Sequence, residues 1–389
     1  MEKLKVIQFL DVMNDGGAET LVKDYLLMLD KEQFDVVLVN IWQAHNTANW
    51  EIVTKNKIRI ITIYPWWFLR WWNIPCMVLH KLIKKWYIPW RLKKIIKNEK
   101  PDIIHVHHFL LRYLKAIAKE LTNIKLFYTC HSLPKFFLGD NQSPEYLAAA
   151  YLIKHNNLRL IGLHADMVVE LNNMFNIDNT FLLNNGIDFR CFNNNATTKD
   201  IERNDLHIPQ DAFVLGHVGS FKKPKNHKFL ADIFIKIAAN NPKAYLLMVG
   251  SGWLGNGGWR KWLIQKKLNF AGLKGRYQIL SNRSDINKIL KAMDVFLFPS
   301  LWEGLSIALV EAQVSGLRCV VSDAINKAGI LTSKCKVLPL GDADLWANTI
   351  LNNDADDKSF NNFDDWNMRK EIKKLEMFYK GEDNIKKTE

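Results

Sequence analysis

The alternation of short apolar segments with longer amphipathic ones constrains the fold of this chain more than any other feature. In the first half, strands are expected at Lys5–Leu10, Phe34–Asn40, Ile58–Ile63, Ile103–His107 and Lys125–Cys130. Helices are expected at Thr20–Leu29 and near Leu111–Leu121, and the alternation continues through Ala165–Leu171 and Asn179–Leu183. Strands that alternate with helices are typical of a parallel sheet, and so of an α/β fold.

The same pattern restarts after Asn184-Asn185-Gly186. Strands are expected at Phe213–Val218, Tyr245–Val249, Val295–Phe298 and Arg318–Ser322, and helices at His227–Ala239 and Ile307–Val314. A length of 389 residues suits two domains, since one domain takes roughly 100–200 residues. The sequence therefore predicts two doubly wound domains with a junction near residues 184–192.

Composition excludes several classes of protein. No run reaches the roughly 18 apolar residues of a membrane-spanning helix, and we expect no secretory signal at the N-terminus. The five cysteines are scattered without a CxxC pair, which favours a reducing cytoplasm over a disulfide framework or a zinc site. His105, His107 and His108 have no carboxylate cluster at metal-ligand spacing, so no metal site is expected.

The net charge of +13 is concentrated in part at residues 64–97, which hold eight Lys or Arg, six Trp and no acid. Trp prefers the headgroup level of a bilayer, and cations are attracted to anionic lipids. The segment fits an amphipathic helix over Val78–Ile96, broken near Pro89, that docks on a membrane, and it equally fits a helical hairpin packed on the core. A second acid-free tract, residues 233–284, carries nine basic residues. No nucleic-acid motif accompanies this charge, so no nucleic-acid partner is expected.

The most specific motif is PSLWEGLSIALVEAQVSGL at residues 299–317. Glu303 is expected in a loop at the carboxyl end of a strand, where open α/β sheets bind ligands, and Glu311 in the helix that follows. Amides near Gly304–Ser306 would face an anion with the help of the helix dipole. The two carboxylates could accept hydrogen bonds from hydroxyls at the two ends of a nucleotide sugar. The same spacing also fits a Glu that only stabilises the helix N-terminus, with an unrelated second Glu.

In this context the segment resembles the E-x7-E signature of family-4 retaining glycosyltransferases, whose fold has two Rossmann-like domains facing across a cleft (GT-B). Other similar motifs follow in the family's order: Gly16-Gly17-Ala18-Glu19, Asp102…His105-Val106-His107 with the later His131, Asn185-Gly186-Ile187-Asp188, Gly219…Lys225-Asn226-His227, and 293–300. The resemblance spans essentially the whole chain and is closest to bacterial capsule and exopolysaccharide members.

This resemblance implies a division into domains. Residues 1–184 would form an acceptor-binding Rossmann-like domain, and residues 185–360 a nucleotide-sugar-binding one. A C-terminal helix within 361–389 would pack back on the first domain.

The resemblance also implies roles for single residues. Glu303, His131 and Lys225 would be catalytic: Glu303 would contact hydroxyls of the donor sugar, His131 would lie near that sugar, and Lys225 would neutralise the diphosphate. Glu311 would contact the ribose. The remaining donor-binding residues would be Gly16, Gly17, Ser220, Asn282, Arg283, Gly304, Leu305 and Ser306.

Two positions depart from the family pattern. The phosphate loop reads Gly219-Ser220-Phe221 where the family has Gly-Arg-Phe. A lysine nearby does not replace the bidentate guanidinium well. Arg318, where the family often has Pro, is a second departure. Both keep a non-catalytic subunit with a protein partner as an alternative.

These observations predict a retaining hexosyltransferase in bacterial surface polysaccharide synthesis. The donor would be a nucleoside-diphosphate sugar, with UDP the expected base, and no cofactor or metal is expected. The acceptor would be a saccharide, lipid-linked, met at the inner face of the plasma membrane by a cytoplasmic, peripheral protein. A sugar-nucleotide epimerase on the same fold is a further alternative.

Overall fold

The computed structural model describes residues 2–44, 47–64, 77–192, 198–250, 258–281, 283, 285–352, 363 and 366–382, with only the backbone of 77–84. These residues form two compact units. The first holds the chain up to Asn185 together with the C-terminal segment from Arg369, and the second runs from Gly186 to Met368. No helix in the described ranges is long and apolar enough to cross a membrane.

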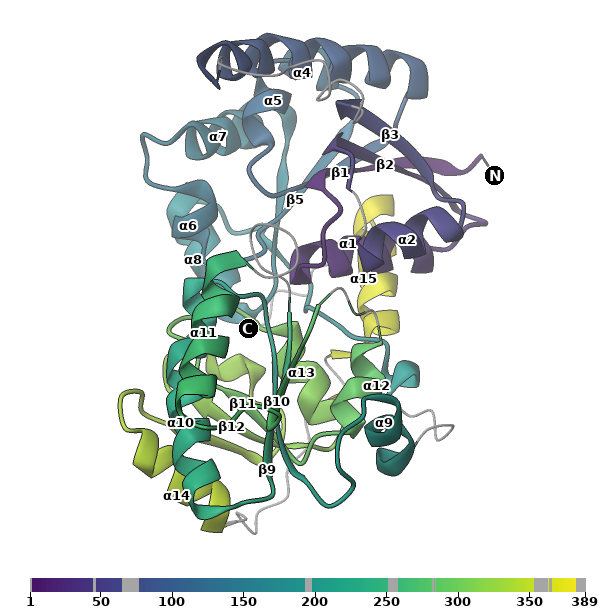
Figure 1. The fold of residues 1–389 in the computed structure, drawn as a ribbon. Coiled ribbons are helices and arrows are strands. Elements are labelled where there is room, and N and C mark those ends of the chain that lie inside the picture. The colour runs from purple at the N-terminus through teal and green to yellow at the C-terminus, as the bar shows by residue number, and fades with distance from the viewer. Residues whose placement is uncertain are drawn as a thin grey trace. The chain divides into compact units, whose positions relative to one another are not determined.

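The first unit is built on a parallel seven-stranded sheet of order β3-β2-β1-β4-β5-β6-β7 (Figure 1). Its strands are β1 (Leu4–Val12), β2 (Phe34–Trp42), β3 (Arg59–Tyr64), β4 (Ile103–His107), β5 (Lys125–Thr129), β6 (Arg159–Gly162) and β7 (Phe181–Leu182). Its helices are α1 (Gly17–Met28), α2 (Ala48–Lys55), α4 (Met77–Glu99), α5 (Leu111–Lys115), α6 (Pro134–Leu138), α7 (Pro144–Asn156), α8 (Ala165–Phe175) and α15 (Met368–Lys380). The strand order reverses between β1 and β4, as in a doubly wound fold.

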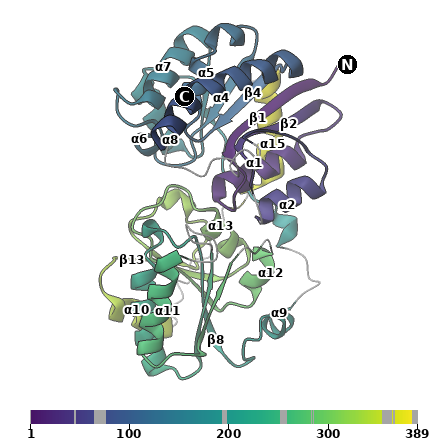
Figure 2. The same cartoon turned by 45° about the horizontal axis from the view of Figure 1, so that its top comes forward.

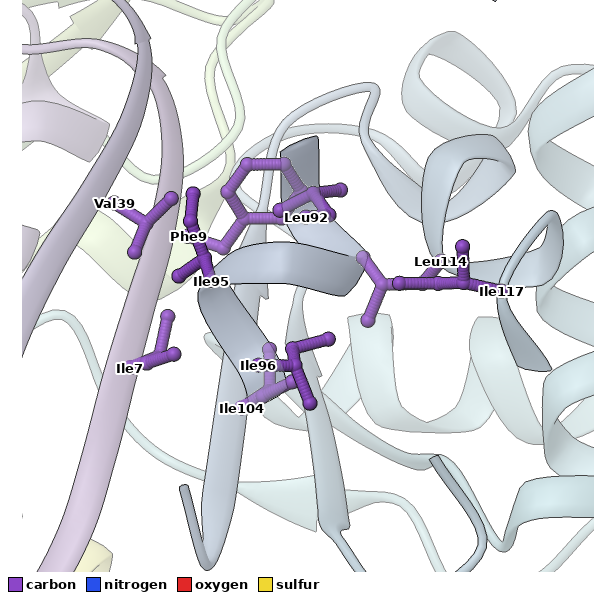
Figure 3. A pocket seen from close by; sticks show the side chains of 9 residues that line it. All are labelled: Ile7, Phe9, Val39, Leu92, Ile95, Ile96, Ile104, Leu114 and Ile117. Atoms are coloured by element: carbon purple, nitrogen blue, oxygen red, sulfur yellow. The ribbon is translucent and has the colours of Figure 1, made fainter. Parts of the chain in front are cut away.

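The side chains of strand β1 show which helices cover each face of the sheet. Ile7 and Phe9 face α4 and α5, whereas Leu10 packs with α1 and α2, because successive side chains of a strand point to opposite faces. Figure 3 shows the apolar contact layer below α4, where Ile7, Phe9 and Leu92 border a cavity of about 10 Å³. So small and apolar a space is a packing defect rather than a ligand site.

Two helices of the first unit differ from expectation. The predicted break of the helix near Pro89 is wrong, because α4 continues through this proline as one helix. A proline removes one intrahelical hydrogen bond, and the buried side chains of Ile88, Leu92 and Ile95 hold the helix on the sheet. The helix expected near Leu111–Leu121 is α5 followed by a separate 3₁₀ turn at Ala118–Leu121.

Helix α15 belongs to the first unit although it lies at the end of the chain (Figure 2). The Glu376 carboxylate accepts from the Asp30 amide at 2.8 Å, and the Lys125 ammonium donates to the Tyr379 carbonyl at 2.9 Å. The rings of Phe378 and Phe181 lie 4.0 Å apart. A cation at the last carbonyls also suits the negative end of the helix dipole.

The second unit carries a parallel six-stranded sheet of order β10-β9-β8-β11-β12-β13. Its strands are β8 (Phe213–Val218), β9 (Ala244–Val249), β10 (Tyr277–Leu280), β11 (Val295–Phe298), β12 (Arg318–Ser322) and β13 (Cys335–Leu338). Its helices are α9 (Lys199–Asp205), α10 (His227–Asn240), α11 (Gly258–Phe270), α12 (Ile286–Lys291), α13 (Ile307–Val314) and α14 (Ala343–Asn352). Apolar side chains of α10, α11 and α14 share one core cluster, and those of α12 and α13, with Leu206 just after α9, share the other, so helices cover both faces (Figure 1).

Candidate functional site

In the second unit, two loops meet where the strand order reverses. Strands β8 and β11 are neighbours, and each runs directly into a loop, 219–226 and 299–306 respectively. The Leu301 amide donates to the Pro224 carbonyl at 2.8 Å, which ties the two loops together. In open α/β sheets, ligands bind in the crevice outside the carboxyl ends of the strands at such a switch point.

Lys225 and Glu303 form an ion pair between these loops. The Lys225 ammonium lies 2.8 Å from a Glu303 carboxylate oxygen and 4.5 Å from the centre of the Phe298 ring. Each side chain is less than one-fifth exposed, at 17% and 16%. The backbone of Glu303 also pairs with Ile325 in a parallel bridge, which fixes its position. A partly desolvated cation is thus held at the crevice beside a carboxylate.

Two glycines allow the backbones around this crevice to approach closely. A Cβ on Gly250, which follows β9, would lie 2.0 Å from the carbonyl oxygen of Gly219. A Cβ on Gly219 would lie 3.0 Å from both Lys225 Cδ and His217 Nε2. At position 250 only glycine fits, because the obstacle is backbone, whereas at position 219 a Cβ would press on two side chains.

The remaining donor-site candidates lie along the same unit. Gly304 and Leu305 are half-buried in the loop, Ser306 is the N-cap residue of α13 without a side-chain cap hydrogen bond, and Glu311 is half-buried one turn into α13. The amides at the start of α13 therefore have no capping side chain from Ser306. Ser220 is half-buried in the first loop, and its carbonyl accepts from the Lys222 amide at 2.6 Å.

The segment around Asn282 and Arg283, a candidate for binding the base of the nucleotide, is only partly described. Asn282 lies outside the described residues. The Arg283 guanidinium pairs with the Asp285 carboxylate through two hydrogen bonds, of 2.7 and 2.5 Å. This pairing raises the pKa of Arg283 and lowers that of Asp285. The charge of Arg283 is therefore already matched within the segment.

In the first unit, the candidate residues also lie at the carboxyl edge of the sheet. Gly16 is the N-cap residue of α1 and Gly17 is its first residue, just after β1. His131 follows β5, and β4 alone separates β1 from β5 in the sheet. The three residues thus come from one edge of this unit, while the other candidates belong to the second unit.

His131 is the outer end of a buried chain of hydrogen bonds. Its Nε2 lies 2.8 Å from His107 Nδ1, and His107 Nε2 lies 2.9 Å from the amide oxygen of Gln8. The Gln8 amide nitrogen donates to the Tyr379 hydroxyl at 2.9 Å, and that hydroxyl lies 2.7 Å from His105 Nδ1. His105 Nε2 then lies 2.7 Å from the Thr129 hydroxyl.

The direction of this chain fixes the tautomers. The amide oxygen of Gln8 is an acceptor, so His107 carries its proton on Nε2. The Nδ1 of neutral His107 then accepts from Nε2–H of His131, which leaves Nδ1 of His131 as an acceptor nitrogen. Tyr379 accepts from Gln8 and donates to His105. Each hydrogen bond of the chain then joins one donor to one acceptor, with all imidazoles neutral.

Burial keeps these imidazoles neutral. Desolvation lowers the pKa of His105 to about 3. Desolvation, followed by the neighbouring imidazoles, lowers the pKa values of His107 and His131 well below the ordinary value. At neutral pH, His131 is therefore a hydrogen-bond acceptor at Nδ1 rather than a cation.

Sequence reasoning missed several of these partners. Phe298 lies under the Lys225 ammonium, while Gln8 and Tyr379 complete the histidine chain from distant parts of the sequence. The i, i+2 spacing of His105 and His107 on one strand was a signal that both face the same side of the sheet. Among the residues that the structure describes, no cluster of His, Cys, Asp and Glu has the arrangement of a metal site.

Comparison with protein families identifies both halves of the chain. The family described as "Glycosyltransferase Family 4" matches residues 15–190, and "Glycosyl transferases group 1" matches residues 212–353. The second match contains both switch-point loops of the second unit, 219–226 and 299–306.

Two relatives extend the comparison. The chain is 31% identical over 281 residues to the UDP-Gal:alpha-D-GlcNAc-diphosphoundecaprenol alpha-1,3-galactosyltransferase of Escherichia coli, covering 69% of this chain and 70% of that protein. It is 27% identical over 374 residues to EpsF of Bacillus subtilis, covering 89% of this chain and 86% of that protein.

Solved structures show the same fold. The Anabaena HepE structure in complex with UDP and glucose matches with a TM-score of 0.70 at 18% identity, over 96% of this chain and 95% of that one. A glycosyltransferase from Rickettsia africae matches with a TM-score of 0.72 at 15% identity, over 98% and 99%. The chain therefore belongs to the family-4 glycosyltransferases and is an enzyme of the glycosyltransferase class, with two Rossmann-like domains of the GT-B fold.

Proposed function

We propose that the protein moves a hexose from a UDP-sugar to a lipid-linked saccharide, with retention of anomeric configuration, during synthesis of a bacterial surface polysaccharide. The observation that carries the proposal is the Lys225–Glu303 pair at the switch point of the second unit. The names of two relatives support it: the Escherichia coli protein is named for UDP-Gal and a diphosphoundecaprenol-linked acceptor, and CapH of Staphylococcus aureus, 22% identical, for capsular polysaccharide biosynthesis.

The ion pair suits a donor that carries both a diphosphate and sugar hydroxyls. When a diphosphate binds, the Lys225 ammonium leaves the Glu303 carboxylate and pairs with the phosphates, which carry more negative charge. Glu303 then accepts hydrogen bonds from hydroxyls of the sugar, and Glu311 from those of the ribose. The uncapped amides at the start of α13 add donors to the anion. Interactions of this kind gain strength where water is excluded.

The transfer step follows from the same groups. We propose front-face attack, in which the acceptor oxygen bonds to the anomeric carbon as the bond to the leaving phosphate breaks. The acceptor proton goes to a phosphate oxygen, and Lys225 stabilises the charge of the leaving diphosphate. We also propose that no metal is required. Product NMR tests retention, and equal rates with and without EDTA test the independence from metal.

Helix α4 supplies the proposed contact of the first unit with the inner face of the plasma membrane. Trp86 and Trp90 are 76% and 49% exposed, and the Lys94 ammonium lies 3.8 Å from the Trp90 ring centre. The opposite side of α4 packs on the sheet, so one helix combines a core face with an aromatic and basic face. Residues 65–76, including four of the tryptophans, lie outside the described residues.

A thermal-shift panel with UDP, GDP and ADP tests the donor. UDP at 100 times its dissociation constant is expected to stabilise the protein by about 2.7 kcal/mol. Lys225→Met should lose most of this effect. Lys236→Met is the matched control, because Lys236 forms an exposed ion pair with Asp344 at 2.9 Å in the same unit. Equal UDP shifts in the two variants would contradict the proposed donor site.

Ser220 favours one alternative, a subunit that keeps the fold, assists a protein partner and transfers no sugar. It stands where the resemblance predicts an Arg that would hold the diphosphate in two hydrogen bonds. If the alternative holds, no nucleotide shifts the wild-type chain, and Glu303→Ala leaves polysaccharide synthesis in cells unchanged. Ser220→Arg, by contrast, should strengthen UDP binding in a working transferase. Product analysis with one labelled UDP-sugar separates transfer from epimerisation.

A further inference from the structure

The second unit carries an exposed aromatic face on helix α11. Trp259, Trp262, Leu263 and Phe270 are 62%, 56%, 41% and 95% exposed. At about 100° per residue, these four side chains lie within an arc of about 100° on the helix surface. Ile264 and Leu268 lie on the opposite side, buried in the core shared with α10 and α14. Helix α11 runs beside α10 in the second unit (Figure 1). The helix therefore has one face in the core and one apolar face in solvent.

Basic side chains accompany these aromatic rings. The Arg260 guanidinium lies 4.8 Å from the Trp259 ring centre, and the Lys266 ammonium lies 5.1 Å from that of Trp262. Lys274, just beyond the helix, is exposed as well. The sequence holds no acid between residues 233 and 284. Lys267, on the flank of α11, pairs with Asp232 of α10.

We propose that this α11 surface, made of Trp259, Arg260, Trp262, Leu263, Lys266 and Phe270, docks the sugar-nucleotide-binding unit on an anionic lipid bilayer. Trp and Phe rings suit the boundary between headgroups and acyl chains, and the cations complement anionic headgroups. An exposed apolar face bordered by basic side chains is poorly suited to ordinary solvent. The surface lies on a different unit from α4. Its proposed role rests on the proposed function, in which the acceptor is lipid-linked.

Vesicle flotation of the full chain tests this docking. The probes are phosphatidylcholine vesicles with and without phosphatidylglycerol. The triple variant W259S/W262S/F270S should lower partitioning onto anionic vesicles at least about tenfold. R260Q/K266Q should lower it roughly twenty-five-fold, about fivefold for each cation, and should have little effect on neutral vesicles. Ile201→Ser on α9 removes another exposed apolar side chain, 44% exposed, and should change nothing.

The outcomes separate docking from other uses of the surface. If R260Q/K266Q and the triple variant both partition like the wild type, the proposal is overturned. A change of oligomeric state or the loss of a protein partner without a change in partitioning overturns it too. All the variants keep α4 unchanged, so any lipid binding through α4 contributes equally to each and does not affect the ratio of their partitioning to that of the wild type. Wild-type protein that docks through α11 yet shows no UDP shift refutes only the proposed function. A UDP shift without vesicle binding refutes only the docking.

Discussion

Replacing Tyr379 with Phe removes one hydroxyl from the centre of the buried histidine chain. The change leaves the ring packing of α15 intact, so its cost comes from hydrogen bonds rather than from a cavity. The Gln8 amide N–H loses its acceptor at 2.9 Å, and His105 Nδ1 loses its donor at 2.7 Å. All three side chains are fully buried, with an exposure of 0%.

The magnitude follows from the two groups left without partners. Each buried unsatisfied group costs about 1–3 kcal/mol, so the free energy of unfolding of the first unit should fall by about 2–6 kcal/mol. A tautomer switch does not rescue His105. If its proton moved to Nδ1, Nε2 would accept from Thr129, and Nδ1–H would then be the unsatisfied group.

Hydrogen exchange of β1 and β4 peptides measures this loss within the first unit, without assuming that both units unfold together. A loss of 2–6 kcal/mol corresponds to exchange faster by roughly 30-fold to 2 × 10⁴-fold. Tyr277→Phe is the control in the second unit, because the Tyr277 hydroxyl donates to Asn269 at 2.9 Å near solvent. That variant should cost less than about 1 kcal/mol. If Tyr379→Phe costs no more than the control, the reasoning about the buried chain is wrong.

Acid pH and changes in or beside the switch-point loops of the second unit should alter stability and UDP binding. The pKa of His105 is about 3 in the folded state and about 6.5 when unfolded, so its contribution to stability is complete above pH 6.5 and is lost as pH falls toward 3. Between pH 7 and 5 the loss is about 2 kcal/mol, measurable by calorimetry. Glu303→Gln removes the carboxylate that pairs with Lys225, and should tighten UDP binding severalfold by calorimetric titration while lowering turnover at least about 100-fold. Gly250→Ala places a Cβ 2.0 Å from the Gly219 carbonyl oxygen, and should cost about 1–3 kcal/mol and weaken the UDP shift.

Each of these predictions has a clear contrary result. Equal unfolding temperatures at pH 7 and 5 would contradict the assignment of buried neutral imidazoles. Weaker UDP binding by Glu303→Gln would mean that the carboxylate does not compete with phosphate for Lys225. Gly329→Ala is the control for Gly250→Ala, because a Cβ there would meet no atom closer than 3.8 Å. Equal losses in these two variants would exclude the backbone clash as the cause.

Local sequence patterns predicted much of the fold. Strands such as β8 and β11 and the helix α13 lie where apolar runs and turn residues place them. The strands β6, β10 and β13 escaped prediction. Strands β10 and β13 lie at sheet edges with mostly half-buried side chains, and so lack a strong apolar run, whereas β6 is buried but only four residues long. Helix α4 crosses Pro89 because its packing on the sheet outweighs the lost hydrogen bond.

The sequence by itself determined the α/β class, the two-domain arrangement and the motif that carries Glu303, since these depend on periodicity and spacing over a few residues. Only the tertiary structure decided which groups meet. Lys225 and Glu303 are 78 residues apart and join because β8 and β11 are neighbours in the sheet. Gln8 and Tyr379, 371 residues apart, set the tautomers around His131. Such pairings depend on strand order and on the docking of α15, and no local pattern encodes them.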